Sequence, residues 1–217
     1  MFALICGIAL GLSGCVCQTV FKNPLASPDI IGVANGANLG SAIAIVLFSS
    51  SSIISISIGS FLGGIVATLS VLLIARAVNS NTTSVYVLSG IIINAISSAF
   101  IIALKYFADP NNELQTIEYW EMGTLSAVTL SKLLWIIIPF LISFTLILLL
   151  SRQIEMLSLS DNECKSLGVR VKPLKIITFI CSTLLVSSVI CITGLISFVG
   201  LIAPHIARTI LKKKYSL

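Results

Sequence analysis

The sequence alternates long apolar runs with short polar connections. Runs that are nearly free of charged residues cover positions 1–20, 30–48, 53–75, 85–107, 133–150, 176–196 and 198–211. A helix rises about 1.5 Å per residue, so about 20 apolar residues cross a hydrocarbon layer of roughly 30 Å. The first six runs reach or approach this length, and the seventh is short. The pattern therefore predicts an all-α membrane bundle with about seven spans.

The last apolar stretch is too long for a single span. Residues 176–207 contain no Asp, Glu, Lys or Arg, and one helix of that length would measure about 48 Å. Gly194, Gly200 and Pro204 lie within it, and glycine and proline weaken or interrupt helices. We expect one full span, a break between Gly194 and Gly200, and a short last span that returns toward Arg208. Interrupted helices in membranes line a path or pack closely on a neighbour.

Composition agrees with a membrane protein, and the charges predict its orientation. The chain is 57% hydrophobic and 10% charged, with a mean hydropathy of +1.09. If residue 1 lies outside and all seven runs cross, every one of the 13 Lys and Arg residues except Lys105 and Lys132 lies on the inner side. Lys and Arg concentrate in cytoplasmic loops, which favours this orientation. The basic residues fall between apolar runs and form no continuous face, so we expect a lipid surface and no nucleic acid as their partner.

Small and polar residues within the spans indicate how the helices pack. Glycines four residues apart place a flat face on a helix and allow close approach in lipid. Polar residues within or near the spans either contact a substrate or, as we favour, form hydrogen bonds between helices. The glycine sets are Gly7/Gly11, Gly32/Gly36/Gly40 and Gly59/Gly63, and the polar residues are Gln18, Asn35, Asn38, Asn94 and His205.

The outer segment 108–131 carries four acidic residues beside Trp120. The favoured interpretation is a solvated loop with an interfacial tryptophan, because Trp is enriched at membrane surfaces. The alternative is a docking surface for an extracytoplasmic partner.

The inner segment 152–169 contains a complete set of helix-end signals. Ser160 and Glu163 form the S-x-x-E capping box, and Asp161 and Glu163 suit the positive N-terminal end of a helix. Lys165 suits the C-terminal end, and Gly168 supplies a stop. The signals predict a helix of about two turns, which is too short to be stable alone. It must be held by the bundle or by a partner, as suits an element that receives force from a soluble protein.

Four stretches of the sequence carry family motifs, at 14–37, 120–125, 157–168 and 194–208. In order and spacing they resemble the permease subunits of iron-siderophore, haem and cobalamin ABC importers, the FecCD/BtuC-like family of type II importers. The matching positions, to which the resemblance gives structural or translocation roles, are Gln18, Asn23, Pro24, Pro28, Gly32, Asn35, Gly36, Gly194, Gly200, Pro204, His205 and Arg208.

The resemblance implies a bacterial cytoplasmic-membrane subunit of ten helices that pairs with a second copy or a paralogue. It also implies a cytosolic ATPase dimer and an extracytoplasmic binding protein that delivers an iron-siderophore chelate, haem or cobalamin. The permease would not be an enzyme, because ATP is hydrolysed on the partner. The positions expected to couple to the ATPase are Leu157, Leu159, Ser160, Asp161, Glu163, Lys165, Ser166, Leu167 and Gly168.

The sequence departs from the family in two respects. Residues 160–164 read Ser-Asp-Asn-Glu-Cys, where a Gly-Glu-Glu-x-Ala pattern is more usual. The family's first span and its last two have no counterpart in these 217 residues. We therefore expect a single permease domain over 1–217 that is incomplete at both ends, either a fragment or a truncated, inactive form.

Two other classes of function are less favoured. An intramembrane enzyme would need a motif such as H-E-x-x-H or G-x-S-x-G, and neither is present. The one histidine, His205, follows Pro204, which suggests a structural position at a helix start. A secondary transporter or channel usually places ionisable residues at mid-membrane, where this chain has none. The sequence has no phosphate-binding loop, and Cys15 and Cys17 point to opposite sides of a helix, so we expect no cofactor and no metal.

Overall fold

The computed structural model describes residues 2–48, 52–78, 82–126 and 130–211. Within these ranges the regular structure is helical, as the apolar pattern predicts. The elements are α1 (Phe2–Phe21), η1 (Pro28–Ile31, a 3-10 helix), α2 (Val33–Leu47), α3 (Ile53–Ala77), α4 (Thr83–Phe107), α5 (Glu113–Met122), α6 (Leu130–Leu149), α7 (Ser151–Met156), α8 (Asp161–Ser166), α9 (Val171–Thr193) and α10 (Val199–Leu211).

Every predicted span corresponds to an apolar helix. Among the described residues, α1, α3, α4 and α9 are long and apolar enough to cross a membrane, and α2, α6 and α10 contribute shorter apolar helices. Two of the boundaries that differ from the prediction affect the later argument. α9 begins at Val171, before the predicted residue 176, so Lys172 and Lys175 belong to the helix. α2 begins only at Val33, because Gly32 turns the chain with a φ of 85° that separates it from η1.

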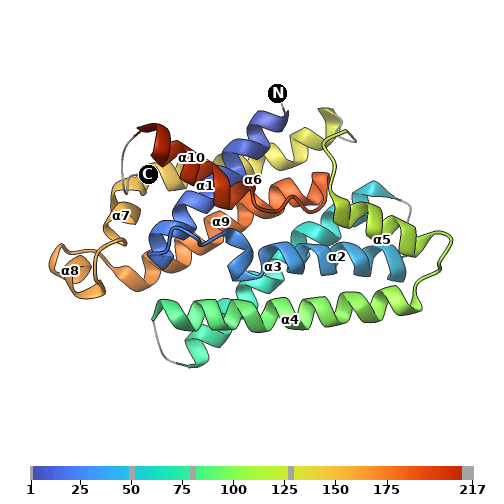
Figure 1. The fold of residues 1–217 in the computed structure, drawn as a ribbon, viewed down its shortest axis with the longest axis horizontal. Coiled ribbons are helices and arrows are strands. Elements are labelled where there is room, and N and C mark those ends of the chain that lie inside the picture. Colours follow the sequence, from blue (N-terminus) through green and yellow to red (C-terminus); the bar gives the residue numbers. More distant parts are fainter. Residues whose placement is uncertain (1, 49–51, 79–81, 127–129, 212–217) are drawn as a thin grey trace.

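The helices pack around α9, which runs through the middle of the bundle (Figure 1). α1, α3 and α6 pack against it, whereas α4 lies along one edge and leaves most of its surface exposed. The short helices α7 and α8 lie at one end of the molecule, and the turn from α4 to α5 lies at the other (Figure 1). The segments predicted to be cytosolic and extracytoplasmic are thus at opposite ends.

The close contact between α2 and α3 depends on glycine. Gly36 and Gly40 of α2 face Gly59 and Gly63 of α3, and a Cβ added at any of the four would overlap the facing backbone or an alanine. This confirms the predicted seam for these two helices. On α1 the prediction is wrong for Gly7, which has nothing within 4 Å of an added Cβ.

The contact between α1 and α10 uses Gly14, which the four-residue spacing did not identify. A Cβ on Gly14 would overlap the carbonyl group of Gly200. Pro204 has no N–H, so it cannot donate the helical hydrogen bond to this carbonyl. This carbonyl lies at the place where α1 has no side chain, which allows the two backbones to approach closely.

The predicted break in the last apolar stretch is confirmed. α9 ends at Thr193, Gly194 and Phe198 have φ values of 71° and 66°, and α10 begins at Val199. The expectation for His205 was wrong in its position, because Pro204 and His205 lie inside α10 and not at its start, and His205 is exposed.

We predict that the α5 end lies outside the cell and the α8 end in the cytosol. Single cysteines at exposed Asn112 and Asn162, introduced after the six native cysteines are replaced, report on the two ends. An impermeant maleimide added to intact cells should label the cysteine at position 112, and that at position 162 only after permeabilisation. The reverse pattern would invert the topology.

Gly14→Ala should destabilise the bundle because its methyl group overlaps the Gly200 carbonyl. Overpacking of this kind costs about 1–3 kcal/mol. Thermal unfolding in detergent should show a clear loss of stability, whereas Gly7→Ala on the same helix should unfold like the wild type. Equal stability of the two variants would contradict the α1–α10 contact.

Candidate functional site

The short helix α8 begins with the predicted capping box. The Ser160 hydroxyl oxygen accepts a hydrogen bond from the Glu163 amide at 3.3 Å, and the Glu163 carboxylate accepts one from the Ser160 amide at 2.8 Å. These bonds satisfy two amides at the helix start that have no partner within the helix.

The end of α8 is also as predicted. Gly168 has a φ of 79°, and its amide donates to the Lys165 carbonyl at 3.0 Å. The Val169 amide donates to the Cys164 carbonyl at 3.0 Å. This is the 6→1 hydrogen bond of the Schellman motif, which ends a helix at a glycine. The Cys164 side chain is fully buried, and its thiol donates to the Met156 carbonyl of α7 at 2.9 Å. α8 is therefore capped at both ends and fastened to α7.

The residues expected to meet an ATPase do not share one environment. Leu157 is 1% exposed and belongs to the core, so its side chain is not available on the surface. Leu159 and Leu167 are 39% and 58% exposed. Ser160, Glu163, Lys165, Ser166 and Gly168 are exposed as well, and Asp161 is partly buried. Two exposed leucines, Leu159 before α8 and Leu167 directly after it, thus flank a polar helix at the end of the bundle.

Asp161, the first residue of α8, lies between two lysines. Its two carboxylate oxygens are 3.3 and 3.2 Å from the Lys175 ammonium of α9, and one is 3.8 Å from the ammonium of Lys22. The sequence analysis counted Lys175 only as an inner-side charge. No local signal could have paired it with Asp161, because a turn and the start of α9 separate the two.

Gln18 joins α1 to α10 with both polar ends of its side chain. Its amide nitrogen donates to the Leu201 carbonyl at 3.3 Å, and its oxygen accepts a hydrogen bond from the Arg208 guanidinium. Gln18 is 4% exposed, so both bonds are shielded from solvent. The first and last motif stretches therefore meet in space. Pro28 joins them, since a Cβ on Gly200 would lie 3.0 Å from its ring.

Asn35 and Asn94 also form the inter-helix hydrogen bonds that the favoured interpretation predicts. Asn94 of α4 donates to the Asp29 carbonyl in η1 at 2.9 Å, and Asn35 of α2 donates to the Ser98 hydroxyl at 3.4 Å. Asn23 accepts from the Leu25 amide at 2.9 Å and so shapes the turn that contains Pro24.

The outer segment is not simply a solvated loop, which corrects the favoured interpretation. Residues Glu113–Met122 form α5, and Ile117 on this helix is 1% exposed. Glu121 accepts from the Lys105 ammonium at 2.6 Å and from the Asn38 amide at 3.0 Å. These contacts fasten α5 to α4 and α2. The sequence pattern did not identify them, because the three residues lie on different helices.

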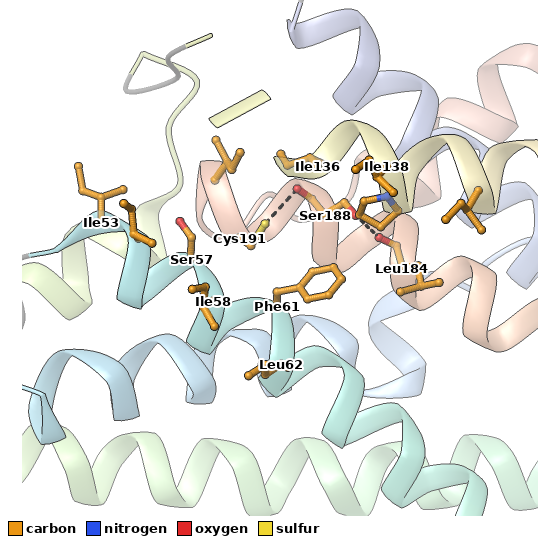
Figure 2. A pocket seen from close by; sticks show the side chains of 14 residues that line it. Ile53, Ser57, Ile58, Phe61, Leu62, Ile136, Ile138, Leu184, Ser188 and Cys191 are labelled. Atoms are coloured by element: carbon orange, nitrogen blue, oxygen red, sulfur yellow. Dashed lines mark hydrogen bonds between the residues drawn. The ribbon is translucent and has the colours of Figure 1, made fainter. Parts of the chain in front are cut away.

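An apolar groove of about 710 Å³ lies between α3 and α6, with α9 along its floor (Figure 2). Ile53, Ile58, Ile138 and Leu184 are among the residues that line it. The Ser188 hydroxyl donates to the carbonyl of Leu184 in its own helix, so it offers no free donor to the groove. This surface suits lipid chains or apolar side chains, and the described residues that line it include no charged side chain.

We predict that Ser160→Ala raises the pKa of Glu163. The hydrogen bond from the Ser160 hydroxyl is the main cause that lowers this pKa, and the Ser160 amide and nearby Lys22 lower it further. A carboxyl group whose pKa is lower in the folded than in the unfolded state stabilises the folded helix at pH values above its unfolded-state pKa. This contribution is lost as the pH falls through the folded-state pKa. Carbon-13 NMR of the carboxyl groups should detect the change. Ser166→Ala is the control, because its hydroxyl bonds to the Asn162 carbonyl and should leave the Glu163 pKa unchanged.

Comparison with known proteins identifies the family. Residues 1–217 match the FecCD transport family. The molybdate import permease MolB of Haemophilus influenzae is 36% identical over 206 residues, which cover 95% of this chain and 60% of the relative. The hemin permease HmuU of Yersinia pestis is 32% identical, covering 96% of this chain and 63% of the relative. The ferric enterobactin permease FepG of Escherichia coli is 35% identical, covering 97% and 63%.

A solved structure has the same fold. It is an inward-facing ABC transporter described as of the metal-chelate type, with a TM-score of 0.90 and 34% identity over 99% of this chain and 68% of that one. The chain spans less than two thirds of the length of the curated relatives named above. With a match over all 217 residues, the chain belongs to the FecCD transport family.

Proposed function

We propose that this chain is the membrane-spanning permease part of an ATP-driven importer, with ATP hydrolysed on a separate subunit. The observation that carries the proposal is α8, a capped and anchored helix that is flanked by the exposed Leu159 and Leu167 at one end of the bundle. Exposed apolar side chains next to a rigid polar helix fit a protein partner better than they fit water. An ATPase whose surface receives this helix would convert its own movement into movement of the bundle.

The interrupted helices support a transport role for the bundle. Gly200, at the start of α10, and Pro28, at the start of η1, both lie next to the middle of α1. If α1 crosses the membrane, both interruptions lie at about mid-membrane. Transporters place discontinuous helices at this depth, where short segments can move without breaking whole spans.

For the substrate, we propose a metal-containing chelate of the iron-siderophore type, with haem or cobalamin as the neighbouring possibilities. The support is the substrate class of the relatives HmuU and FepG, whose names specify hemin and ferric enterobactin. MolB imports molybdate by name, so uptake assays should compare iron chelates with molybdate.

For the assembly, we propose a second permease copy or paralogue, a cytosolic ATPase dimer and an extracytoplasmic binding protein, in a bacterial cytoplasmic membrane. α4 supports an additional helix partner or lipid, because its apolar side chains Leu88, Ile91 and Phe100 are 55–60% exposed. The chain contains no phosphate-binding loop of its own, which fits an ATP site on another subunit.

Leu167→Asp should abolish binding of the ATPase while the bundle still inserts in the membrane. Leu167 is 58% exposed, so a charge there does not disturb the core, but it would become buried in the interface. An unpaired buried charge costs several kcal/mol, which weakens binding about 100-fold or more. Co-purification with the ATPase and ATP-dependent uptake of iron chelate measure the effect.

The matched control is Leu125→Asp, which introduces the same charge at a 46% exposed leucine beyond α5, at the other end of the molecule. It should retain the ATPase. If Leu167→Asp also retains the ATPase and supports uptake, α8 is not the coupling element.

A further inference from the structure

Lys175 is a charged side chain in an unusual environment. Its side chain is 1% exposed, and in the described part of the chain no other charged residue is buried to this degree. Removing an ammonium group from water is costly unless a carboxylate lies close to it. A lysine in this position therefore requires a partner, and the partner fixes the neighbouring backbone.

Asp161 provides that carboxylate. Both of its oxygens lie within 3.3 Å of the Lys175 ammonium, and its own side chain is 40% exposed. The two sides of the pair are unequal, because water can solvate the carboxylate but hardly reaches the ammonium. Because the buried ammonium group needs this carboxylate, the ion pair holds the first turn of α8 against α9.

α8 is attached at two points that lie on different helices. The Cys164 thiol bonds to the Met156 carbonyl at the end of α7, and Asp161 pairs with Lys175 on α9. Two separated attachments fix both the position and the rotation of a short helix, and hence the direction in which Leu159 and Leu167 project. Lys22 extends the Asp161 contact to the end of α1, but at 3.8 Å and with 35% exposure it contributes less.

We propose that Lys175 is a positioning residue for energy coupling. Through Asp161, Lys175 orients α8 for the ATPase and joins α8 to α9. A displacement of α8 then moves α9 and, beyond Thr193, the break that leads into α10. The inference rests on the proposed function of α8. It differs from a purely structural role, in which Lys175 would only stabilise the bundle.

The test is Lys175→Met in the complete gene product, assembled with its ATPase. Methionine retains an apolar stem, and Asp161 is 40% exposed, so its carboxylate stays hydrated and is not left as a buried unpaired charge; thermal stability should therefore be unchanged or slightly higher. ATP hydrolysed per molecule imported should rise about tenfold, which corresponds to a coupling loss of about 1.4 kcal/mol. Ferric enterobactin, hemin and molybdate serve as transport probes. Lys175→Arg should restore coupling, because arginine also pairs with a carboxylate.

Lys172→Met is the control, since it removes the same charge from an exposed position one turn earlier on α9. It should couple like the wild type. A lower melting temperature with normal coupling in Lys175→Met would show a structural role and overturn the proposal, as would normal coupling with normal stability.

A second measurement separates this inference from the proposed function. Hydrogen exchange of the α8 amides in the permease without the ATPase should be about tenfold faster in Lys175→Met than in wild type or Lys172→Met. Unchanged exchange would refute the attachment of α8 through Lys175, whatever its partner. Faster exchange in Lys175→Met, combined with a wild-type chain that binds no ATPase, would support the attachment and refute the proposed function.

Discussion

The structure depends on one constraint, which is that backbone groups inside a lipid-embedded bundle must find partners within the protein. Unbroken helices meet it by themselves, but the interruptions at η1 and between α9 and α10 do not. Side-chain amides from intact helices donate additional hydrogen bonds to backbone carbonyls in these segments. Asn94 of α4 donates to the Asp29 carbonyl, and Gln18 of α1 donates to the Leu201 carbonyl. At the end of α9 backbone groups do the same, since the Thr124 amide bonds to Thr193 and the Leu195 amide to Trp120.

These short amide side chains reach their targets because the helices are very close. Where α1 meets α10, Gly14 leaves space for the Gly200 carbonyl, and Gln18 on the next turn then reaches α10. The same arrangement occurs at η1. Gly90 of α4 lies against the Ile30 carbonyl, and the side chain of Asn94, one turn later on α4, donates to the Asp29 carbonyl. In both places a glycine allows the interrupted helix to approach closely, and an amide side chain one turn later forms a hydrogen bond with it.

The two ends of the bundle differ in how they are fastened. At the α5 end, Glu121 connects three helices through Lys105 and Asn38, and α5 is held closely against the bundle. At the α8 end, a buried thiol and an ion pair hold the helix, and the leucines that flank it are exposed. α9 links the two ends, since it carries Lys175 near its start and meets the α5 segment at its end. α9 is buried over most of its length, so its packing contacts join the two ends of the bundle.

The sequence by itself determined the features that depend on neighbouring residues. The apolar runs fixed the helices, the glycines and proline after residue 193 marked the break, and Ser160, Glu163 and Gly168 defined both ends of α8, because capping bonds span only a few positions. Only the tertiary structure decided which glycines touch. It also paired Asp161 with Lys175 and Gln18 with Arg208, and packed α5 instead of leaving it in water. These contacts join residues far apart in the chain, and their energies depend on burial and on the direction of a side chain, which a local pattern of residues does not contain.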